Sequence, residues 1–396
     1  MRSIASTLTL ASTLVLGALT LACPPTDCAD NSAPIAMGAV ADVPASPAAA
    51  AVIELAICLD TSGSMQGLLD AARARIWDIV NDLATAKPTP TLRVALLTFG
   101  NNGNAEEDGW VKVETGFTED LDLVSERLFA LSTNGGEEYV GRVLDAAARR
   151  LEWTGGDAAM KLVVVAGNES ADQDPTVPFR DASRKLIGSG VMVNSIYCGP
   201  PADQLAPAWR EVSTLADGHF AAIDQAQGAI AIETPYDDEL VNLSALINTT
   251  YLPFGATGAW AAENQAAQDS NAQSLNNATA AQRCVTKSGA LYCNDRWDLV
   301  DASAKEGFKL EDVKVEELPE AMRGMTPEER KAHIAAMAKK RAELQQQIAD
   351  LGKQRDAFVE AEQTRLAAES GQESFGTALR RAVRAQAEGK GIAFGG

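Results

Sequence analysis

Short apolar runs alternate with longer segments of helical spacing between residues 51 and 252, and this alternation restricts the possible folds most strongly. Runs such as "AVIELAICL" (51–59) and "MKLVVVAG" (160–167) are apolar almost throughout, as expected of strands buried on both faces. Between them, apolar residues recur every three or four positions, which indicates amphipathic helices. Repeated β–α units predict an α/β fold with a doubly wound, mostly parallel sheet covered by helices on both sides.

The expected elements can be placed along this segment. A last helix should open at Thr234 and Pro235, because threonine is a good N-cap and proline suits the first helical position. We expect strands at 51–59, 92–100, 109–118, 160–167, 191–199 and 219–224, and helices near 68–83, 140–151, 179–188 and 206–216.

Residues 1–22 have the form of a signal peptide: Arg2 precedes a stretch of apolar and small residues that is too short for a membrane span. "LTLAC" resembles a bacterial lipoprotein box in which Cys23 would be lipidated, and ordinary cleavage after Ala22 is the alternative. Either route predicts an extracytoplasmic protein, in the periplasm or held as a lipoprotein at the outer membrane or cell surface. Residues 23–50 are rich in Pro and Ala and predict a flexible tether.

Residues 253–396 form a C-terminal region of different composition. Residues 253–281 are rich in Ala, Gln and Asn and could be a helix or a loose connector. Cys284 and Cys293 flank a Ser-Gly turn signal, which suggests a hairpin closed by a disulfide in an oxidising compartment.

A long helix is expected over about residues 327–365, with Thr326 as its N-cap and Glu329 completing a capping box. Its apolar residues follow heptad spacing, but Arg341 and Arg355 occupy two positions of the apolar seam. We favour a helix packed along its own domain, with a dimeric coiled coil as the alternative.

The charge balance excludes one class of function. The chain has 34 Lys and Arg against 54 Asp and Glu, a formal net charge of −20. Nucleic-acid binders neutralise phosphates with Lys and Arg, so this balance argues against such a partner. An acidic, well-solvated surface is the simpler interpretation.

The stretch "LAICLDTSGSMQG" (55–67) carries the clearest chemistry. It places Asp60, Ser62 and Ser64 at the carboxyl end of the first strand, where α/β sheets bind ligands. A carboxylate followed by two hydroxyls suits a hard divalent cation, and magnesium needs only a partial shell from the protein because it keeps several waters.

Competing enzymatic interpretations fit less well. A haloacid-dehalogenase-type hydrolase needs a second aspartate where Ser62 stands, and Ser64 lacks the flanking glycines of a G-x-S-x-G elbow. The only histidines, His219 and His333, are poorly placed for a triad, and the chain has no P-loop and no H-E-x-x-H motif.

"DTSGSM" after an apolar strand resembles the D-x-S-x-S signature of von Willebrand factor type A domains, and the resemblance covers roughly residues 51–252. It implies the predicted fold, protein binding, and a metal-ion-dependent adhesion site completed by a threonine and an aspartate from later loops. Here Glu137 stands about where the threonine belongs, and Gly167 replaces the aspartate with Glu169 close by.

The resemblance therefore implies a variant site for Mg²⁺, or for Mn²⁺ or Ca²⁺. A glutamate near the ion would neutralise it and weaken its attraction for a partner's carboxylate. The alternative is a degenerate site in which Asp60 and Ser62 only cap backbone N–H groups. The expected metal ligands are Asp60, Ser62, Ser64, Glu137 and Glu169.

These features predict an exported bacterial protein that binds or scaffolds a protein partner, without catalysis, and that meets the membrane only through a lipid on Cys23. Two alternatives remain open. One is a metal-assisted hydrolase that uses Asp60, Glu137, Glu138 and Glu169, and the other is an envelope protein that oligomerises through its long helix.

Overall fold

The computed structural model describes residues 52–156, 159–223, 232–370, 375–389 and 392–394, all within one compact unit, Ala48–Gly396. The predicted signal peptide (1–22), Cys23 and the predicted tether (23–50) lie outside the described residues.

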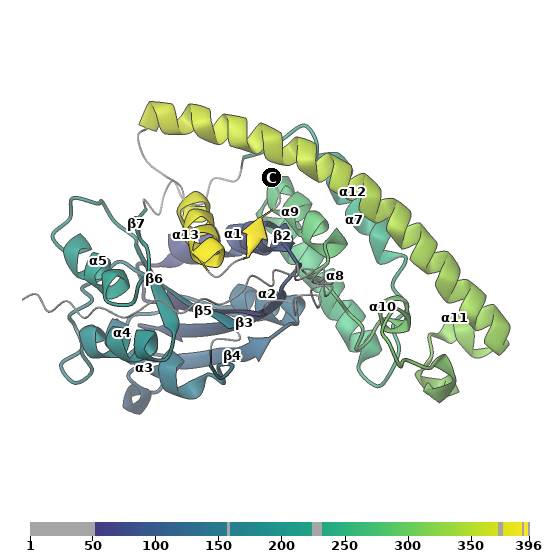
Figure 1. Ribbon diagram of the computed structural model, residues 1–396, viewed down its shortest axis with the longest axis horizontal. Coiled ribbons are helices and arrows are strands. Elements are labelled where there is room, and N and C mark those ends of the chain that lie inside the picture. Colours follow the sequence, from purple (N-terminus) through teal and green to yellow (C-terminus); the bar gives the residue numbers. More distant parts are fainter. Residues whose placement is uncertain (1–51, 157–158, 224–231, 371–374, 390–391, 395–396) are drawn as a thin grey trace, which may run out of the picture. The chain divides into compact units, whose positions relative to one another are not determined.

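A six-stranded sheet in the order β4-β3-β1-β5-β6-β7 forms the centre of this unit (Figure 1). Neighbouring strands are parallel, except that β4 runs antiparallel to β3. The mostly parallel sheet predicted from the β–α alternation is therefore confirmed. The strands are β1 (Val52–Asp60), β3 (Thr91–Phe99), β4 (Lys112–Thr118), β5 (Ala159–Gly167), β6 (Val191–Tyr197) and β7 (Phe220–Ala222).

Helices cover both faces of the sheet, because alternate residues of each strand point to opposite sides. Ala56 and Cys58 of β1 belong to a core with α3, α4 and α5, whereas Leu55 and Leu59 belong to a core with α1 and α2. Trp77 of α1 is fully buried. The helices are α1 (Gln66–Ala84), α2 (Leu121–Ala130), α3 (Val140–Arg150), α4 (Phe179–Gly188) and α5 (Ala206–Thr214).

Two helices differ from the prediction. Helix α2 was not expected; it starts where the Asp120 carboxylate accepts hydrogen bonds from the N–H groups of Asp122 and Leu123, at 3.1 and 3.0 Å. The helix expected to open at Thr234 begins later, as α7 (Asp237–Asn248). Thr234 donates through its N–H and its hydroxyl to the Asp237 carboxylate, both at 2.8 Å, and its hydroxyl accepts from the Tyr236 N–H at 3.3 Å, so Thr234 closes the turn that leads into the helix.

The C-terminal region is helical in its described part. Residues 253–281, for which helix and connector were both open, contribute to α8 and α9, and the Asn276 side chain caps α9 by accepting from the Thr279 N–H at 2.8 Å. The elements are α8 (Gly258–Leu275), α9 (Asn277–Ser288), α10 (Leu299–Ser303), α11 (Glu320–Arg323), α12 (Pro327–Ser370), α13 (Phe375–Gly389), the 3₁₀ turns Glu106–Asp108, Leu310–Asp312 and Val315–Glu317, and the short strands β2 (Ala86–Lys87) and β8 (Ala393–Phe394).

The predicted disulfide hairpin is wrong. Cys284 is buried inside α9 against Leu240 and Ile348, whereas Cys293 is exposed beyond the helix, and both thiols are free. The Ser-Gly pair ends a helix instead of turning a hairpin, because the Gly289 N–H bonds back to the Thr286 carbonyl at 2.9 Å.

The long helix α12 packs against its own chain, as favoured from the sequence. It begins with the predicted capping box: Thr326 N–H donates to Glu329 at 2.8 Å, and Glu329 N–H donates to the Thr326 hydroxyl at 3.3 Å. The seam arginines are buried in ion pairs, Arg341 with Asp298 at 2.7 Å and Arg355 with Asp237 at 2.8 Å. The seam of α12 therefore faces α7, α9 and α10 (Figure 1).

Helix α13 returns to the sheet and packs on α1 and β7 (Figure 1). Val383, Ala387 and Ile392 enter the core on the α1 side of the sheet. Gln386 exchanges two hydrogen bonds with the buried Asn194 of β6, at 2.9 and 3.1 Å. The end of the chain thus completes the core of the N-terminal α/β part.

We expect Gln386→Ala to lower the free energy of unfolding by about 1–2 kcal/mol, because the buried Asn194 side-chain N–H group loses its acceptor. Urea denaturation followed by circular dichroism measures the change. The matched control is Gln346→Ala on the exposed side of α12, where we expect less than about 0.5 kcal/mol. Equal effects at both positions would contradict the importance of the buried pair.

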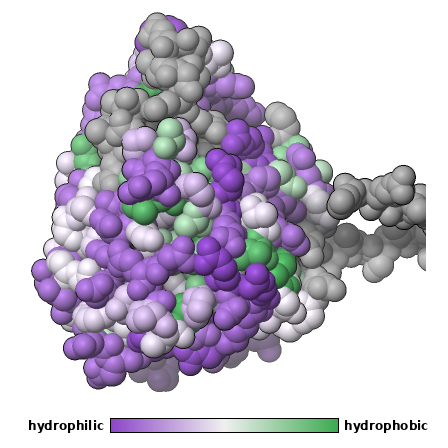
Figure 2. Space-filling model, turned by 90° about the vertical axis from the view of Figure 1, so that its left-hand side faces the viewer, coloured by the Kyte–Doolittle hydropathy of each residue, from purple (hydrophilic) through white to green (hydrophobic). Residues whose placement is uncertain are grey.

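The surface is mainly hydrophilic on the side where α5 and β7 lie in Figure 1, with hydrophobic residues in separate patches (Figure 2). Within the described ranges, no helix has both the length and the apolar character needed to cross a membrane.

Candidate metal centre

Asp60 is the last residue of β1, in the middle of the sheet, where the carboxyl ends of β1, β3 and β5 meet. Its side chain is fully buried, and Ser62 is only 2% exposed. Ser64 is exposed at the mouth of the turn that leads into α1. The end of a central strand therefore sets a buried carboxylate beneath two hydroxyl groups.

Hydrogen bonds hold these three residues together. Ser62 N–H donates to Asp60 Oδ1 at 2.8 Å, and the hydroxyl oxygens of Ser62 and Ser64 lie 3.4 Å apart. Asn168, just after β5, donates through its side-chain N–H to the Ser64 hydroxyl at 3.0 Å. The sequence did not single out Asn168 as a site residue, because its link to Ser64 exists only in the folded chain.

One carboxylate oxygen of Asp60 has no hydrogen-bond partner in the described part of the chain. Oδ2 is buried and accepts no hydrogen bond from the described residues. Burial raises the pKa of Asp60 to about 7, the nearby charge of Glu138 adds to the rise, and the hydrogen bond from the Ser62 N–H offsets only part of it. A buried carboxylate of this kind is destabilising unless a proton or a cation neutralises it.

Glycines make room beside the carboxylate. A Cβ atom on Gly100, whose φ is +76°, would lie 2.8 Å from Asp60 Oδ1 and 3.0 Å from Glu138 Cγ. A Cβ on Gly167 would lie 3.0 Å from Asp60 Oδ2. Gly167, at the position where the resemblance implied an aspartate, thus leaves the unpartnered oxygen uncrowded.

The loop before α3 brings an acidic residue to this place. Its backbone is tied to two strand ends: Asn134 N–H donates to the Thr61 carbonyl at 3.0 Å, and Asn102 N–H donates to the Gly135 carbonyl at 2.8 Å. Glu138 N–H donates to the side chain of Gln173 at 3.1 Å. These contacts fix the Glu138 side chain next to Asp60.

Glu138, and not the predicted Glu137, therefore faces Asp60, while Glu137 is exposed. The sequence prediction missed by one residue because an irregular loop has no periodicity that would fix which side chain points inward. Burial raises the pKa of Glu138, and the charges of Glu169 and Glu137 contribute to the rise. Glu169 is half-buried, and its carbonyl accepts from the Trp209 indole N–H at 2.7 Å.

The residues present fit a hard divalent cation. Asp60, Ser62, Ser64 and Glu138 offer carboxylate and hydroxyl oxygens, the ligands that Mg²⁺ prefers. The described residues contain no group of three His, Cys, Asp or Glu side chains that could hold a metal ion. The candidate site does not need such a group, because two of its four donors are hydroxyl groups. The unpartnered Asp60 Oδ2 is the observation that most directly calls for a positive charge.

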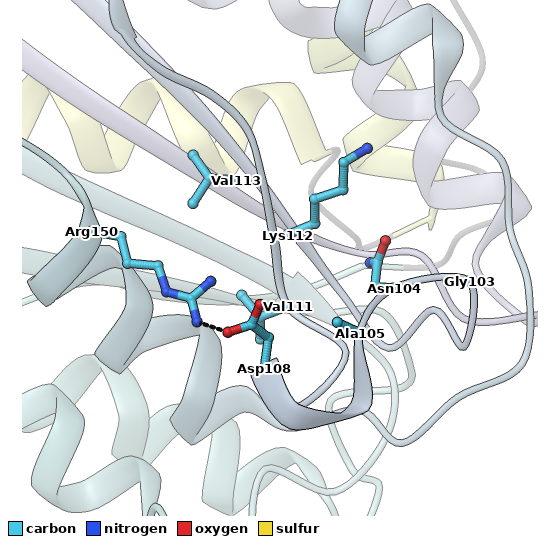
Figure 3. Close-up of a pocket in the computed structure, with 8 residues that line it drawn as sticks. All are labelled: Gly103, Asn104, Ala105, Asp108, Val111, Lys112, Val113 and Arg150. Atoms are coloured by element: carbon cyan, nitrogen blue, oxygen red, sulfur yellow. Dashed lines mark hydrogen bonds and ion pairs between the residues drawn. The ribbon is translucent and has the colours of Figure 1, made fainter.

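A separate pocket of about 430 Å³ lies at the start of β4 (Figure 3). Its charged side chains are already engaged, Arg150 with Asp108 and Lys112 with Glu114. This pocket therefore presents no unpaired charged group to a ligand. It is lined by Gly103, Asn104, Ala105, Asp108, Val111, Lys112, Val113 and Arg150.

Comparisons with known proteins agree with the fold. The sequence profile of the von Willebrand factor type A domain matches residues 54–221. A comparison with curated proteins found no match.

Several solved structures resemble the chain. One is a von Willebrand factor type A protein from Catenulispora acidiphila, with 18% identity, a TM-score of 0.35, and coverage of 45% of this chain and 40% of that one. The SpRpn10 VWA domain has 14% identity and a TM-score of 0.36, over 44% of this chain and 90% of that one. Proximal thread matrix protein 1 from the mussel byssus, in a structure with a zinc-occupied MIDAS motif, has 16% identity and a TM-score of 0.36, over 45% of this chain and 43% of that one.

The present chain thus spans less than two thirds of the Catenulispora and mussel proteins. The profile match begins inside β1 and ends inside β7, so it contains the whole central sheet apart from the outermost residues of these two strands. Residues 54–221 form a von Willebrand factor type A domain.

Proposed function

We propose that this protein binds or scaffolds a protein partner through the carboxyl-end face of its von Willebrand factor type A domain, without catalysis, and that a divalent cation organises that face. Domains of this type commonly mediate protein–protein interaction. The observation that supports the cation is the buried Asp60 carboxylate, whose Oδ2 has no partner among the described residues and which lies beside Glu138.

Asp60, Ser62, Ser64 and Glu138 would hold the ion, with Asn168 orienting the Ser64 hydroxyl. Mg²⁺ is the proposed ion, and Mn²⁺ or Ca²⁺ are alternatives with the same preference for oxygen. A bound cation would supply the positive charge that lets Asp60 stay ionised while buried. It would also tie together two loops that are far apart in the sequence, the turn after β1 and the loop before α3.

The export proposal rests on residues 1–22 and on Cys23, which would carry a lipid if the "LTLAC" box is processed. The proposal that the protein is bacterial rests on the same residues. Mass spectrometry of the mature protein's N-terminus tests both points, and an intact Met1 would contradict export.

The two alternatives differ in their support. Oligomerisation through the long helix is less supported, because the α12 seam that would form the contact is already covered by the same chain. Arg341, Ile348 and Arg355 of this seam are buried. The hydrolase alternative stays a prediction, which screening against phosphoester and peptide substrates would test.

A capture experiment tests the proposed function. Envelope extract is passed over immobilised wild type and over Ser62→Ala/Ser64→Ala, each with Mg²⁺ or with EDTA. We expect a partner that is retained only by the wild type and only with Mg²⁺. The double substitution and EDTA should each remove the cation from the face. A partner retained equally under all four conditions would contradict a cation-organised face.

Cation affinity should depend on pH, because the ligands must lose their protons before binding. With an Asp60 pKa of about 7, we expect Mn²⁺ affinity to be about tenfold weaker at pH 6 than at pH 8. Electron paramagnetic resonance of free Mn²⁺ measures the affinity at both values. An affinity independent of pH across this range would show that Asp60 is not a ligand.

A further inference from the structure

The loop that follows β5, residues 167–173, connects the two halves of the candidate metal centre, and we call it the β5 loop. Asn168 donates through its side-chain N–H to the Ser64 hydroxyl at 3.0 Å, in the turn after β1. The Gln173 side chain accepts from the Glu138 N–H at 3.1 Å, in the loop before α3. The β5 loop supplies none of the four proposed ligands, but it contacts both segments that carry them.

The β5 loop is itself anchored to α5 by Trp209, whose side chain is fully buried. The Trp209 indole N–H donates to the Glu169 carbonyl at 2.7 Å. The outer edge of the ring lies against Gly167, where a Cβ atom would be 3.1 Å from Trp209 Cη2. One side chain thus holds the loop at two points, by packing at Gly167 and by a hydrogen bond at Glu169.

Trp209 is held in turn by the central sheet. Its carbonyl accepts from the hydroxyl of Ser195, a buried residue of β6, at 2.7 Å. Just after β6, the Cys198 N–H donates to the Gly167 carbonyl at 2.9 Å. The end of β6, the helix α5 and the start of the β5 loop therefore form one connected frame.

A second link between the β5 loop and α5 lies nearer the surface. Arg180 of α4 pairs with Asp172 of the loop at 2.5 Å and with Glu211 of α5 at 2.6 Å. These three side chains are 36–51% exposed, and ion pairs in water contribute little. The buried contacts of Trp209 are therefore the main anchor of the loop.

The positions of the ligands decide how tightly a hard cation is held, because Mg²⁺ demands a nearly ideal octahedron of oxygens. Removing a residue that orients a metal ligand typically weakens metal binding roughly 10- to 100-fold. Asn168 and Gln173 are such residues here, since each bonds to a residue that carries a proposed ligand. Their own positions depend on the β5 loop and hence on Trp209.

We propose that Trp209 is a positioning residue of the metal centre. It fixes the β5 loop, and through Asn168 and Gln173 it sets the places of Ser64 and Glu138. Trp209 acts without contacting the ion. This inference rests on the proposed function and adds a residue behind the ligands that controls the cation affinity of the same site.

The test measures the Mn²⁺ affinity of the full chain at pH 8 by electron paramagnetic resonance. Trp209→Phe removes the indole N–H and the outer ring edge but keeps an aromatic side chain. Trp153→Phe is the matched control, because the Trp153 indole N–H also donates to a carbonyl, that of Ala147, at 2.9 Å. Trp153 lies at the opposite end of the sheet, where the N–H of its neighbour Thr154 donates to Glu54 near the start of β1.

A further variant, Asn168→Ala/Gln173→Ala, disconnects the β5 loop from both ligand-bearing segments, and it is also combined with Trp209→Phe. We expect Trp209→Phe to weaken Mn²⁺ binding about fivefold and the double alanine variant to weaken it about tenfold. Adding Trp209→Phe to the double variant should change the affinity less than about twofold further, because Trp209 acts through these two residues. Trp153→Phe should stay within about twofold of wild type.

Stability in EDTA is measured for both tryptophan variants, since a merely structural Trp209 would lower stability and leave the Mn²⁺ affinity unchanged. Unchanged affinity in Trp209→Phe, equal weakening in Trp153→Phe, or a full fivefold loss on adding Trp209→Phe to the double variant would overturn the proposal. If Trp209→Phe does not fold, wild-type affinity in the double alanine variant overturns it instead. A wild type that binds no Mn²⁺ contradicts the proposed function as well, whereas the other outcomes, with the ion bound by wild type, contradict the positioning role alone.

Discussion

Arg283→Met is expected to lower the free energy of unfolding by about 3–5 kcal/mol, the range found when one partner of a buried ion pair is removed. Arg283 of α9 is 1% exposed and pairs with Asp122 of α2 at 2.8 Å and with Asp269 of α8 at 2.6 Å. Burial alone would lower its pKa, but the two carboxylates hold the pKa above its ordinary value. Its guanidinium carbon also lies 4.9 Å from the ring centre of Trp77 in α1.

The substitution leaves two carboxylates with less compensation. Asp122, 5% exposed, keeps a hydrogen bond from the Tyr292 hydroxyl but loses its ion pair. Asp269 keeps Lys287 at 2.6 Å. This network joins α1 and α2, which lie inside the von Willebrand factor type A domain, to α8 and α9, which lie outside it. We therefore expect the domain and the C-terminal region to unfold in one transition.

Urea denaturation, followed by both circular dichroism and tryptophan fluorescence, measures the loss. Arg149→Met is the control, because Arg149 forms an exposed pair with Asp145 and should cost less than about 1 kcal/mol. A loss at Arg283 no larger than at Arg149, or two separate transitions in the wild type, would contradict this role.

Asp60→Asn is expected to act in opposite directions with and without metal. At pH 8 in EDTA, we expect the variant to be more stable than wild type by about 2–4 kcal/mol, because a pKa raised from 3.8 to about 7 makes ionised Asp60 costly in the fold. Between about pH 4 and pH 7 the folded protein holds a proton that the unfolded chain has released. Stability of the metal-free wild type therefore falls as the pH rises through this range, and the variant lacks that fall.

With Mg²⁺, the difference in free energy of unfolding between the variant and the wild type should shrink or change sign. Saturating ion stabilises the wild type, by about 2.7 kcal/mol at a hundred times its Kd, and does not stabilise the variant. Urea denaturation at pH 5 and pH 8, each with EDTA or Mg²⁺, gives the comparison, with exposed Glu343→Gln as a control of equal charge change. A variant less stable than wild type at pH 8 in EDTA, or equal stabilisation by Mg²⁺, would contradict the account.

The central sheet could be predicted because burial on both faces leaves a simple pattern. β1 and β5 are apolar almost throughout, and Asp60 interrupts β1 where the strand ends. Asp60, Ser62 and Ser64 share one short turn, so their spacing alone brings them together. Local sequence was sufficient for this half of the candidate site.

The other half depends on tertiary contacts. Glu138 reaches Asp60 because Gly100 leaves room and the loop is tied to two strand ends, and neither condition is visible in local sequence. Asn168 acts through a hydrogen bond to a residue far away in the chain.

In the C-terminal region, too, local sequence could not reveal structure that depends on distant contacts. Cys284 was assigned to a hairpin from a Ser-Gly signal that serves a helix end equally well. Helix α13 was missed because its partners, Asn194 and Asp82, lie far back in the chain.

Calorimetric titration of the metal-free protein with Mg²⁺ at pH 8, wild type beside Asp60→Asn, tests the central claim most directly. The account predicts one saturable site in the wild type and none in the variant. Absence of binding in the wild type, with Mn²⁺ and Ca²⁺ also failing to bind, or equal binding in both proteins, would contradict a cation at Asp60.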